Sequence, residues 1–430
     1  MGAATKLRTY SREEQAARRR LRVVDTARVP AYVVWELTLK CDHACHHCGS
    51  RAARARPGEL GTEQALAIVK QLAELGTREL VLTGGEAYLH PGFLDVVRAA
   101  AEQGITPIMT TGGAGITREL ALAMKEAGMA RVSVSIDGLE ASHDRIRAKR
   151  GSFAAATAAL DYLKEAALDL AANTNINRIN QGDLEALYAH LRDSRVRSWQ
   201  VQLTVPLGRG ADHPDMLLQP WMLLDLFPRL DALKKRALRD GILIMPGNNL
   251  GYYGPEEFRL RSQKLDGSEH FRGCQAGRYV MGIESDGAIK GCPSLQTASY
   301  AVGRWSADQD VAAWWNDDSE ALRFNERNRK HELWGRCASC EFASVCQGGC
   351  SFTAHAFFGR RGNNPYCHYR AIRLRREGLR ERVVMKRPAP GVPFDHAQFG
   401  RAVEKEIEVR RDNAAIAKLK KRLESNGAVE

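Results

Sequence analysis

The sequence has no long apolar run, no internal repeat and no low-complexity tract, and each absence excludes a class of protein. Without a stretch of about 18 apolar residues, the chain offers no candidate for a transmembrane helix. Residues 1–22 are charged and lack the apolar segment of a secretory signal, so we expect a cytoplasmic protein. Basic residues are not interleaved with aromatic ones, which argues against nucleic acid as a partner.

Positive charge is in excess, and much of it lies near the two ends of the chain. The formal net charge is +12 at pH 7. The terminal basic residues are Arg18, Arg19, Arg20, Arg22, Arg410, Arg411, Lys418, Lys420, Lys421 and Arg422. The simpler interpretation is that they belong to solvated helix faces. The alternative is that they attract an acidic partner, such as an acidic leader peptide or an anionic substrate.

Cysteine is the most informative residue type, because all ten cysteines fall into two spaced groups. The groups are Cys41, Cys45 and Cys48, and then Cys274, Cys292, Cys337, Cys340, Cys346, Cys350 and Cys367. In a large chain without a secretory signal, such spacings indicate metal or iron–sulfur ligands rather than disulfides. Taken alone, the cysteines from Cys337 to Cys350 would also suit a structural zinc site with four sulfur ligands.

Strand-like and helix-like segments alternate from about residue 31 to about residue 210. The predicted strands are Tyr32–Leu39, Glu79–Thr83, Thr106–Thr110, Arg131–Ile136, Leu170–Ile176 and Ser198–Val205. Helical segments such as Thr62–Leu75 and Pro91–Gln103 lie between them. This alternation predicts an α/β fold with right-handed crossovers. Six such units make a partial TIM-like barrel that is open on one side.

The rest of the chain is organised around this barrel. We expect a charged N-terminal arm at 1–30, the barrel at 31–210, a bridging region at 211–272, a small cysteine-rich α+β domain at 273–375 and a charged tail at 376–430. The bridging region predicts a helix over Trp221–Arg239 that is kinked or restarted at Pro228. Its loop at 246–255 is either a run of turns or a substrate contact. A helical pattern covers Ala402–Leu423 in the tail.

One face of several predicted strands is polar at every second position. Its residues are Glu36, Thr38, Lys40, Ser133, Ser135, Asp137, Asn173, Asn175, Asn177, Gln200, Gln202 and Thr204. Alternate residues share a face, and helices cover the outside of a parallel sheet. We therefore expect this face to line a wet cavity, with Asn175 and Gln202 near a cofactor or substrate. The alternative is that the face looks outward to water.

Four segments together resemble the radical S-adenosylmethionine (SAM) superfamily. They are Cys41–Cys48, Thr83–Glu86, Ser133–Gly138 and His143–Arg147. The first follows the first predicted strand, at the end where barrel enzymes build their active sites. The resemblance implies an oxidoreductase-type enzyme that cleaves SAM reductively and uses the 5′-deoxyadenosyl radical to abstract a substrate hydrogen.

The resemblance also implies roles for particular residues. Cys41, Cys45 and Cys48 would ligate a 4Fe–4S cluster whose open iron binds SAM. The expected SAM contacts are Gly84, Gly85 and Glu86 at the amino group, Ser135 and Arg147 at the ribose and carboxylate, Asn175 at the adenosyl group, and Asp137, Gln202 and His47 nearby. His47 departs from the family pattern, which often has an aromatic residue there, and its imidazole would pack against adenine.

The second cysteine group resembles the SPASM extension of radical SAM enzymes, which carries auxiliary iron–sulfur clusters. The resemblance implies an outer 4Fe–4S cluster on Cys337, Cys340, Cys346 and Cys367, and an inner one on Cys274, Cys292 and Cys350. The segment before Cys274 contains no further cysteine. The inner cluster would therefore have an open iron or a different ligand, for which Glu269 and His270 are candidates.

The resemblance favours a ribosomally made peptide as the substrate, because SPASM relatives mostly modify peptides. The alternative is a small molecule or a tetrapyrrole side chain, since residues 205–210 resemble a segment of haem-pathway relatives. We expect an electron donor such as flavodoxin or ferredoxin. The short N-terminal arm would not hold a leader-binding domain, which suggests a separate leader-peptide-binding protein. A non-enzymatic zinc-binding interaction protein would fit the charged ends but leaves Gly84, Gly85 and Glu86 unexplained.

Overall fold

The computed structural model describes residues 28–262, 269–325 and 330–405. Nearly all of the predicted N-terminal arm and the last part of the predicted tail lie outside these residues. Within them, no helix is both long enough and apolar enough to cross a bilayer.

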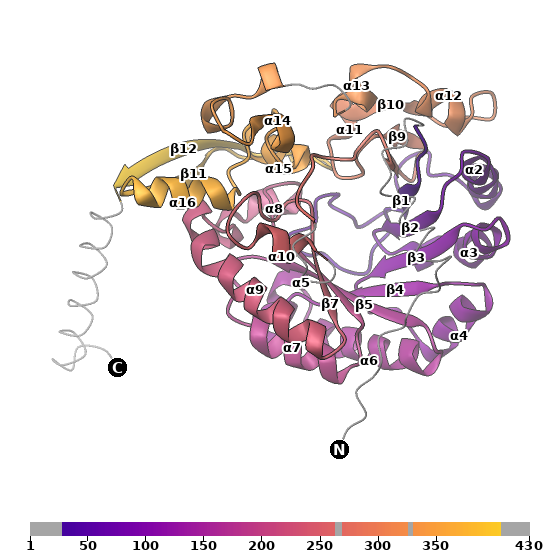
Figure 1. Cartoon of the computed structure of the whole chain (residues 1–430). Coiled ribbons are helices and arrows are strands. Elements are labelled where there is room, and N and C mark those ends of the chain that lie inside the picture. The colour runs from indigo at the N-terminus through magenta and orange to yellow at the C-terminus, as the bar shows by residue number, and fades with distance from the viewer. Residues whose placement is uncertain (1–27, 263–268, 326–329, 406–430) are drawn as a thin grey trace.

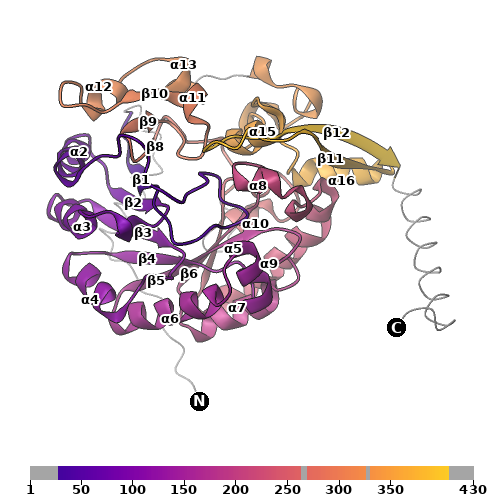
Figure 2. The ribbon, with the colours of Figure 1, turned by 180° about the vertical axis from the view of Figure 1, so that it is seen from behind.

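One curved sheet forms the centre of the molecule (Figures 1 and 2). Its strands, in chain order, are β1 (Tyr32–Thr38), β2 (Glu79–Gly84), β3 (Thr106–Thr111), β4 (Arg131–Ser135), β5 (Asp169–Ile176), β6 (Ser198–Leu203), β7 (Leu243–Pro246), β8 (Val280–Ile283), β9 (Ala288–Lys290) and β10 (Ala301–Arg304). β1 to β7 run parallel in sequential order. β8 pairs parallel with β1 at the other edge, and β9 and β10 follow antiparallel.

Helices cover the outer face of this sheet (Figure 1). The longer ones are α2 (Thr62–Glu74), α3 (Phe93–Glu102), α4 (Arg118–Glu126), α6 (Ser152–Glu165), α7 (Leu184–Asp193) and α9 (Leu223–Arg239). α3 shows why they pack there, because its buried residues Phe93, Val96, Val97 and Ala100 fall on one helical face. The core is the apolar layer between these faces and the sheet.

Shorter elements complete the fold. The short α-helices are α5 (Glu140–Arg147), α8 (Arg209–Asp212), α10 (Glu257–Arg261), α11 (Thr297–Tyr300), α12 (Val311–Trp315), α13 (Glu320–Arg323), α14 (Ala343–Cys346), α15 (Ser351–Phe358) and α16 (His368–Arg376). Single 3₁₀ turns lie at Ala87–Leu89, Pro214–Met216, Pro220–Met222, Lys330–Glu332 and Gly335–Cys337. The segments after β8 lie across one side of the barrel, in orange and yellow in Figure 1.

The predicted α/β fold with a partial parallel barrel is confirmed. All six predicted strands occur, each ending within two residues of its predicted bounds. The sheet also gains β7 from the predicted bridging region and β8 from the cysteine-rich region, so it continues past residues 210 and 272.

Two local predictions need correction. Pro228 does not restart the helix, since it lies inside an uninterrupted α9. A proline costs about 3 kcal/mol inside a helix, and burial of Leu226, Phe227 and Leu230 around it offsets that cost. In the tail, Ala402–Lys405 belong to β12 (Gln398–Lys405), which pairs antiparallel with β11 (Leu379–Arg387) rather than forming a helix. The remainder of that predicted helix lies outside the described residues.

Candidate active site

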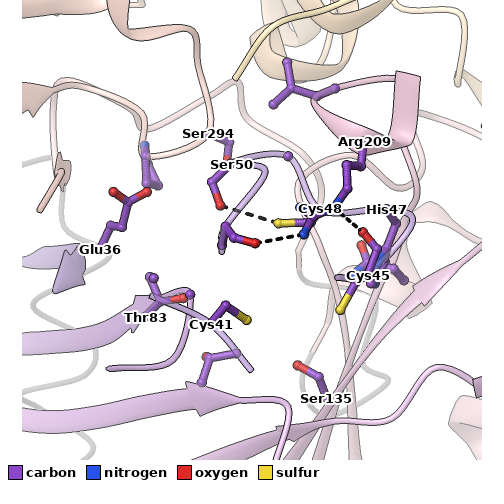
Figure 3. Close-up of a pocket in the computed structure, with 18 of the residues that line it drawn as sticks. Glu36, Cys41, Cys45, His47, Cys48, Ser50, Thr83, Ser135, Arg209 and Ser294 are labelled. Carbon is purple, nitrogen blue, oxygen red and sulfur yellow. Dashed lines mark hydrogen bonds between the residues drawn. The ribbon is translucent and has the colours of Figure 1, made fainter. Parts of the chain in front are cut away.

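A cavity of about 380 Å³ lies where the carboxyl ends of the barrel strands meet. Each of the six barrel strands contributes to its wall, through Glu36, Thr83, Thr110, Ser135, Asn175 and Gln202. Figure 3 shows Glu36, Thr83 and Ser135 of this wall around the loop that follows β1. Parallel strands point their carboxyl ends to one side of a barrel, and the loops there form the site.

The thiols of Cys41, Cys45 and Cys48 line this cavity, and Figure 3 shows their sulfur atoms around a common space. Two hydrogen bonds hold this loop in place. The Arg209 Nε donates to the Cys45 carbonyl at 2.8 Å, and the His46 amide donates to the Ile146 carbonyl at 2.8 Å. Burial raises the pKa of Cys41 to about 12 and also raises the pKa of Cys45. Such buried thiols stay protonated at neutral pH unless a metal displaces the proton.

Gly84 and Gly85 let the end of β2 lie directly against the start of the cysteine loop. The Gly85 amide donates to the Thr38 carbonyl at 2.8 Å. A Cβ on Gly84 would lie 2.1 Å from the Thr38 carbonyl oxygen, and one on Gly85 would lie 1.9 Å from that of Lys40. Gly84 also has φ +143°, which favours glycine. Packing between two backbones therefore requires both glycines, whatever they contact in a bound cofactor.

Glu86 is buried beside the first cysteine. Its carboxylate accepts hydrogen bonds from the Thr111 hydroxyl and from the Gly112 amide, both at 2.6 Å. Burial raises its pKa to about 7, although these two donors act in the opposite direction. Ligand atoms of Glu86, Cys41, Asp42 and His43 lie within 4.8 Å of one another. The side chain thus joins β2 to β3 and faces the thiol site.

Asp137 is fully buried behind the cavity wall rather than in it. It accepts from the Arg147 NH2 at 2.7 Å and pairs with the His47 Nε2 at 2.9 Å. Burial alone would raise its pKa, but Arg147 and His47 hold that pKa well below its usual range. Asp137 thus holds two residues that line the cavity, and a direct contact between Asp137 and the cofactor stays a prediction.

Arg147 has a second partner besides Asp137. Its NH1 donates to the Cys45 sulfur at 3.8 Å, while its Nε is buried without a hydrogen-bond partner. The Nδ1 of His47 is likewise buried and unpartnered. With the Nε2 of His43 and the Oε2 of Glu284, they make four buried, unpartnered polar atoms on side chains that line the cavity, which is unusual in a folded protein. Polar side chains in such numbers suit a cavity that holds a polar ligand. This arrangement fits SAM beside a cluster on the neighbouring thiols.

The polar strand face lines the cavity only near the strand ends. Ser135, Asn175 and Gln202 are in the wall, as expected. Lys40 and Gln200 are exposed, so the inward face that we expected does not include them. Among the other predicted members, Glu36 and Thr204 also line the cavity.

Several cavity residues come from segments in which no sequence pattern predicted a contact with the cavity. Glu284, Ser294 and Phe352 follow β8, and Phe394 comes from the predicted tail. The tail reaches the cavity because the Phe394 amide donates to the Gly49 carbonyl at 3.0 Å, and Arg51 pairs with Asp395 at 3.0 Å. No motif marks these residues, since their position depends on pairing between distant segments.

The structure brings the second cysteine group together as two sets of thiols. The pKa of Cys274 is raised by its burial and, to a smaller extent, by the nearby thiols of Cys350 and Cys292. In the other set, the pKa of Cys346 is raised by its burial and, to a smaller extent, by the nearby thiols of Cys367, Cys337 and Cys340. These neighbours give the sets Cys274, Cys292 and Cys350, and Cys337, Cys340, Cys346 and Cys367.

The two candidates for an additional ligand have other neighbours. Glu269 lies near Lys234. Burial lowers the pKa of Lys234 to about 8, and the negative charge of Glu269 opposes that lowering. His270 packs against the rings of Tyr253 and Phe258, with centroids 6.2 and 5.6 Å away. A role for either as a ligand stays a prediction.

The barrel, the three-thiol loop and the Gly-Gly-Glu segment define a radical SAM enzyme. Residues 35–191 match the radical SAM superfamily, and the chain belongs to it. Members of this family use SAM and an iron–sulfur cluster, so the non-enzymatic zinc-binding alternative is overturned.

Two curated proteins and one solved structure show the extent of the similarity. The chain is 30% identical to the mycofactocin maturase MftC of Mycolicibacterium smegmatis, over 79% of this chain and 82% of that one. It is 26% identical to an AdoMet-dependent heme synthase of Nitratidesulfovibrio vulgaris, over 80% and 93% of the two chains. The fold resembles that of Streptococcus suis SuiB bound to precursor peptide SuiA, with a TM-score of 0.57. The two chains are 18% identical, and the match covers 79% of this chain and 76% of that one.

Proposed function

We propose that this enzyme modifies a ribosomally made peptide by radical SAM chemistry. When bound, the cluster and SAM supply a 5′-deoxyadenosyl radical that abstracts a hydrogen atom from the substrate. The residues of this chain bind both groups, orient them and exclude water from the cavity.

Cys41, Cys45 and Cys48 are the proposed ligands of the SAM cluster. Three thiolates leave one iron open, which is where SAM would bind. The wall next to them would hold SAM through the amino group at Gly84, Gly85 and Glu86, the carboxylate and ribose at Arg147 and Ser135, and the adenosyl group at Asn175, His47 and Gln202. The unpartnered Nε of Arg147 and Nδ1 of His47 support this placement.

The observation that carries the choice of a peptide is the buried carboxylate of Glu284. It is 2% exposed and lines the cavity, and its Oε2 lies 3.6 Å from the Arg56 NH2 but accepts no hydrogen bond. Its Oε1 accepts from the Lys290 Nζ at 2.5 Å and from the Thr297 hydroxyl at 2.6 Å. A buried acceptor of this kind suits a substrate hydrogen-bond donor, such as a peptide N–H.

The charges around Glu284 support the same choice. Glu36 also lines the cavity, and Arg56 pairs with it at 2.6 Å. Of the two arginines in the wall, Arg147 is paired with Asp137, and Arg209 donates to two backbone carbonyls. This side of the cavity therefore offers acceptors, whereas a tetrapyrrole propionate would need unpaired cations or donors.

The two sets of thiols in the C-terminal region are the proposed sites of two auxiliary 4Fe–4S clusters. The set of Cys337, Cys340, Cys346 and Cys367 supplies four ligands, and the set of Cys274, Cys292 and Cys350 supplies three. We further propose that flavodoxin or ferredoxin delivers the electron and that a separate protein binds the leader peptide. We also propose a cytoplasmic location, since thiols stay reduced there.

A tetrapyrrole or small molecule is the second candidate substrate. It is favoured by the similarity to the AdoMet-dependent heme synthase and by the position of residues 205–210, of which Val205, Leu207 and Arg209 line the cavity.

One experiment separates the two candidates. The enzyme is reconstituted anaerobically with iron and sulfide, and deoxyadenosine is measured after addition of SAM and dithionite. Peptides encoded by short reading frames beside the gene are compared with iron coproporphyrin III. We expect a peptide to stimulate deoxyadenosine formation and to change in mass. Stimulation by the porphyrin alone would overturn the peptide assignment.

A further inference from the structure

Tyr252 lies between the two sets of thiols in the C-terminal region. Its side chain is 1% exposed, and its φ is +91°, a backbone conformation that residues with a Cβ rarely adopt. Such a conformation persists only where the surroundings hold it, and it often marks a functional position. The loop at 246–255 consists largely of turns and bends, and packing holds one of its residues in this conformation.

The hydroxyl of Tyr252 binds three groups at once. It accepts from the Cys350 amide at 3.0 Å and from the Asn364 Nδ2 at 3.4 Å. It donates to the carbonyl of Asn248. The ring packs edge-on against Phe271, with centroids 4.8 Å apart. The phenol thus fixes the backbone of Cys350, which belongs to the three-thiol set.

The backbone of the same residue faces the other set. The Tyr252 carbonyl accepts from the Tyr369 amide at 3.2 Å, and the Cys367 sulfur lies 3.9 Å from it. The preceding carbonyl, of Gly251, accepts from the His368 amide at 2.9 Å. These bonds hold the first turn of α16, and Cys367 is the residue immediately before that helix.

The loop also reaches the cavity. Asn249 lines the cavity wall, and its side chain bonds to both the amide and the carbonyl of Leu203, at 3.1 and 2.6 Å. Leu203 is the last residue of β6. Residues 249–252 therefore connect a barrel strand at the active site to both sets of thiols.

We propose that Tyr252 is a positioning residue that fixes one cysteine of each auxiliary cluster, Cys350 through its hydroxyl and Cys367 through its carbonyl. This inference rests on the auxiliary clusters of the proposed function. Partners outside the ligand shell orient the ligands of a metal site, and their loss typically lowers metal affinity by about 10- to 100-fold. Since only the hydroxyl changes in Tyr252→Phe, this variant should perturb the cluster on Cys350 and spare the other.

The test uses the full chain with Cys41, Cys45 and Cys48 changed to alanine, so that only auxiliary iron remains. This parent, its Tyr252→Phe variant and its Tyr253→Phe variant are reconstituted anaerobically. Tyr253→Phe is the matched control, because it removes a hydroxyl of the same loop that donates to the carbonyl of Phe271 and not to a cysteine. Iron and sulfide content, the EPR spectrum of the reduced protein, and iron release to bathophenanthroline are measured.

In Tyr252→Phe we expect about half of the iron to be released roughly tenfold faster than in the parent. One of the two EPR signals should change, and Tyr253→Phe should match the parent. Equal spectra and release rates in the two phenylalanine variants would overturn the role of Tyr252 while leaving the clusters in place. A parent without iron would instead overturn the auxiliary clusters themselves.

A second variant covers the case in which Tyr252→Phe does not fold. Asn364→Ser removes the amide donor to the hydroxyl but keeps an oxygen for the Tyr366 amide, which the Asn364 Oδ1 binds at 2.8 Å. It should accelerate release of the same half of the iron. Parent-like release from this variant would count against the proposal.

Discussion

Replacement of Asp137 by asparagine tests whether the buried charge behind the cavity organises the site. Asparagine keeps the shape and an acceptor for the Asn175 amide, which Asp137 binds at 2.7 Å. It removes the negative charge that faces Arg147 at 2.7 Å. The guanidinium would then be buried without its counter-ion, as Arg147 is only 8% exposed.

The expected cost follows from that geometry. Removal of one partner of a buried ion pair typically destabilises a protein by about 3–5 kcal/mol. Each kcal/mol of lost stability lowers the Tm by about 2–4 °C in chains of 150–250 residues and by less in longer ones. We therefore expect the Tm of Asp137→Asn to be roughly 5 °C below that of the wild type. The double variant Asp137→Asn/Arg147→Gln should be less destabilised than the sum of the single changes, because it leaves no buried unpaired charge.

The pH dependence has a definite sign. Asp137 has a lowered pKa in the folded protein, so its stabilising contribution is fully present above its unfolded pKa of about 3.9 and is lost as the pH falls further. The Tm difference between wild type and Asp137→Asn should therefore be constant from neutral pH to about pH 5 and shrink in acid.

Thermal unfolding of the metal-free chain, followed by circular dichroism, measures these effects. Asp95→Asn is the matched control, because Asp95 pairs with Arg98 at 3.0 Å on the exposed face of α3, where such a pair contributes about 0–1 kcal/mol. An equal Tm for Asp137→Asn and Asp95→Asn would refute the argument that the buried ion pair of Asp137 and Arg147 contributes strongly to the stability of the fold.

Three further changes test the cavity. Cys45→Ala should abolish deoxyadenosine formation with dithionite and leave auxiliary iron in place, so undiminished deoxyadenosine would contradict the cluster assignment. Gly85→Ala places a Cβ 1.9 Å from the Lys40 carbonyl oxygen and should destabilise the chain by about 1–3 kcal/mol or more, measured by urea unfolding; an unchanged midpoint would show that the backbones can separate at no cost. Gln202→Leu should lower turnover at least tenfold with a Tm within about 2 °C of wild type, and the reverse pattern would indicate a structural role.

The barrel was predictable from the sequence because its signals are local. Each strand is a short apolar run followed by a turn, and a helix such as α2 has its own periodicity and a glycine after its end. The strand ends then bring Glu86, Ser135 and Asn175 to one cavity, as parallel strands must. Local pattern and topology together were sufficient for this part of the site.

Pairing between distant segments could not be predicted in the same way. The helical pattern over Ala402–Leu423 is a local preference, but β12 gains ladder hydrogen bonds from β11, and Phe399 packs on Phe357 with centroids 5.4 Å apart. Tertiary contacts of this kind override weak helix propensity. The same pairing delivers Phe394 to the cavity, from a segment that composition alone describes as a charged tail.

Glu284 shows most clearly why the substrate side of the site required the structure. In the sequence it is one acidic residue at the end of a short strand, with nothing to distinguish it from a solvated carboxylate. Its burial arises because β8 pairs with β1, which sets Glu284 beside Lys290 and near Arg56, two cations that would be costly to bury alone. The cations make the buried carboxylate tolerable: the Lys290 Nζ lies 2.5 Å from its Oε1, and the Arg56 NH2 lies 3.6 Å from its Oε2. The Oε2 has no hydrogen-bond partner, and the residue lines the cavity. The burial of Glu284 thus depends on a charge balance between the barrel and the region after it, which no local sequence pattern encodes, whereas the barrel motifs are local.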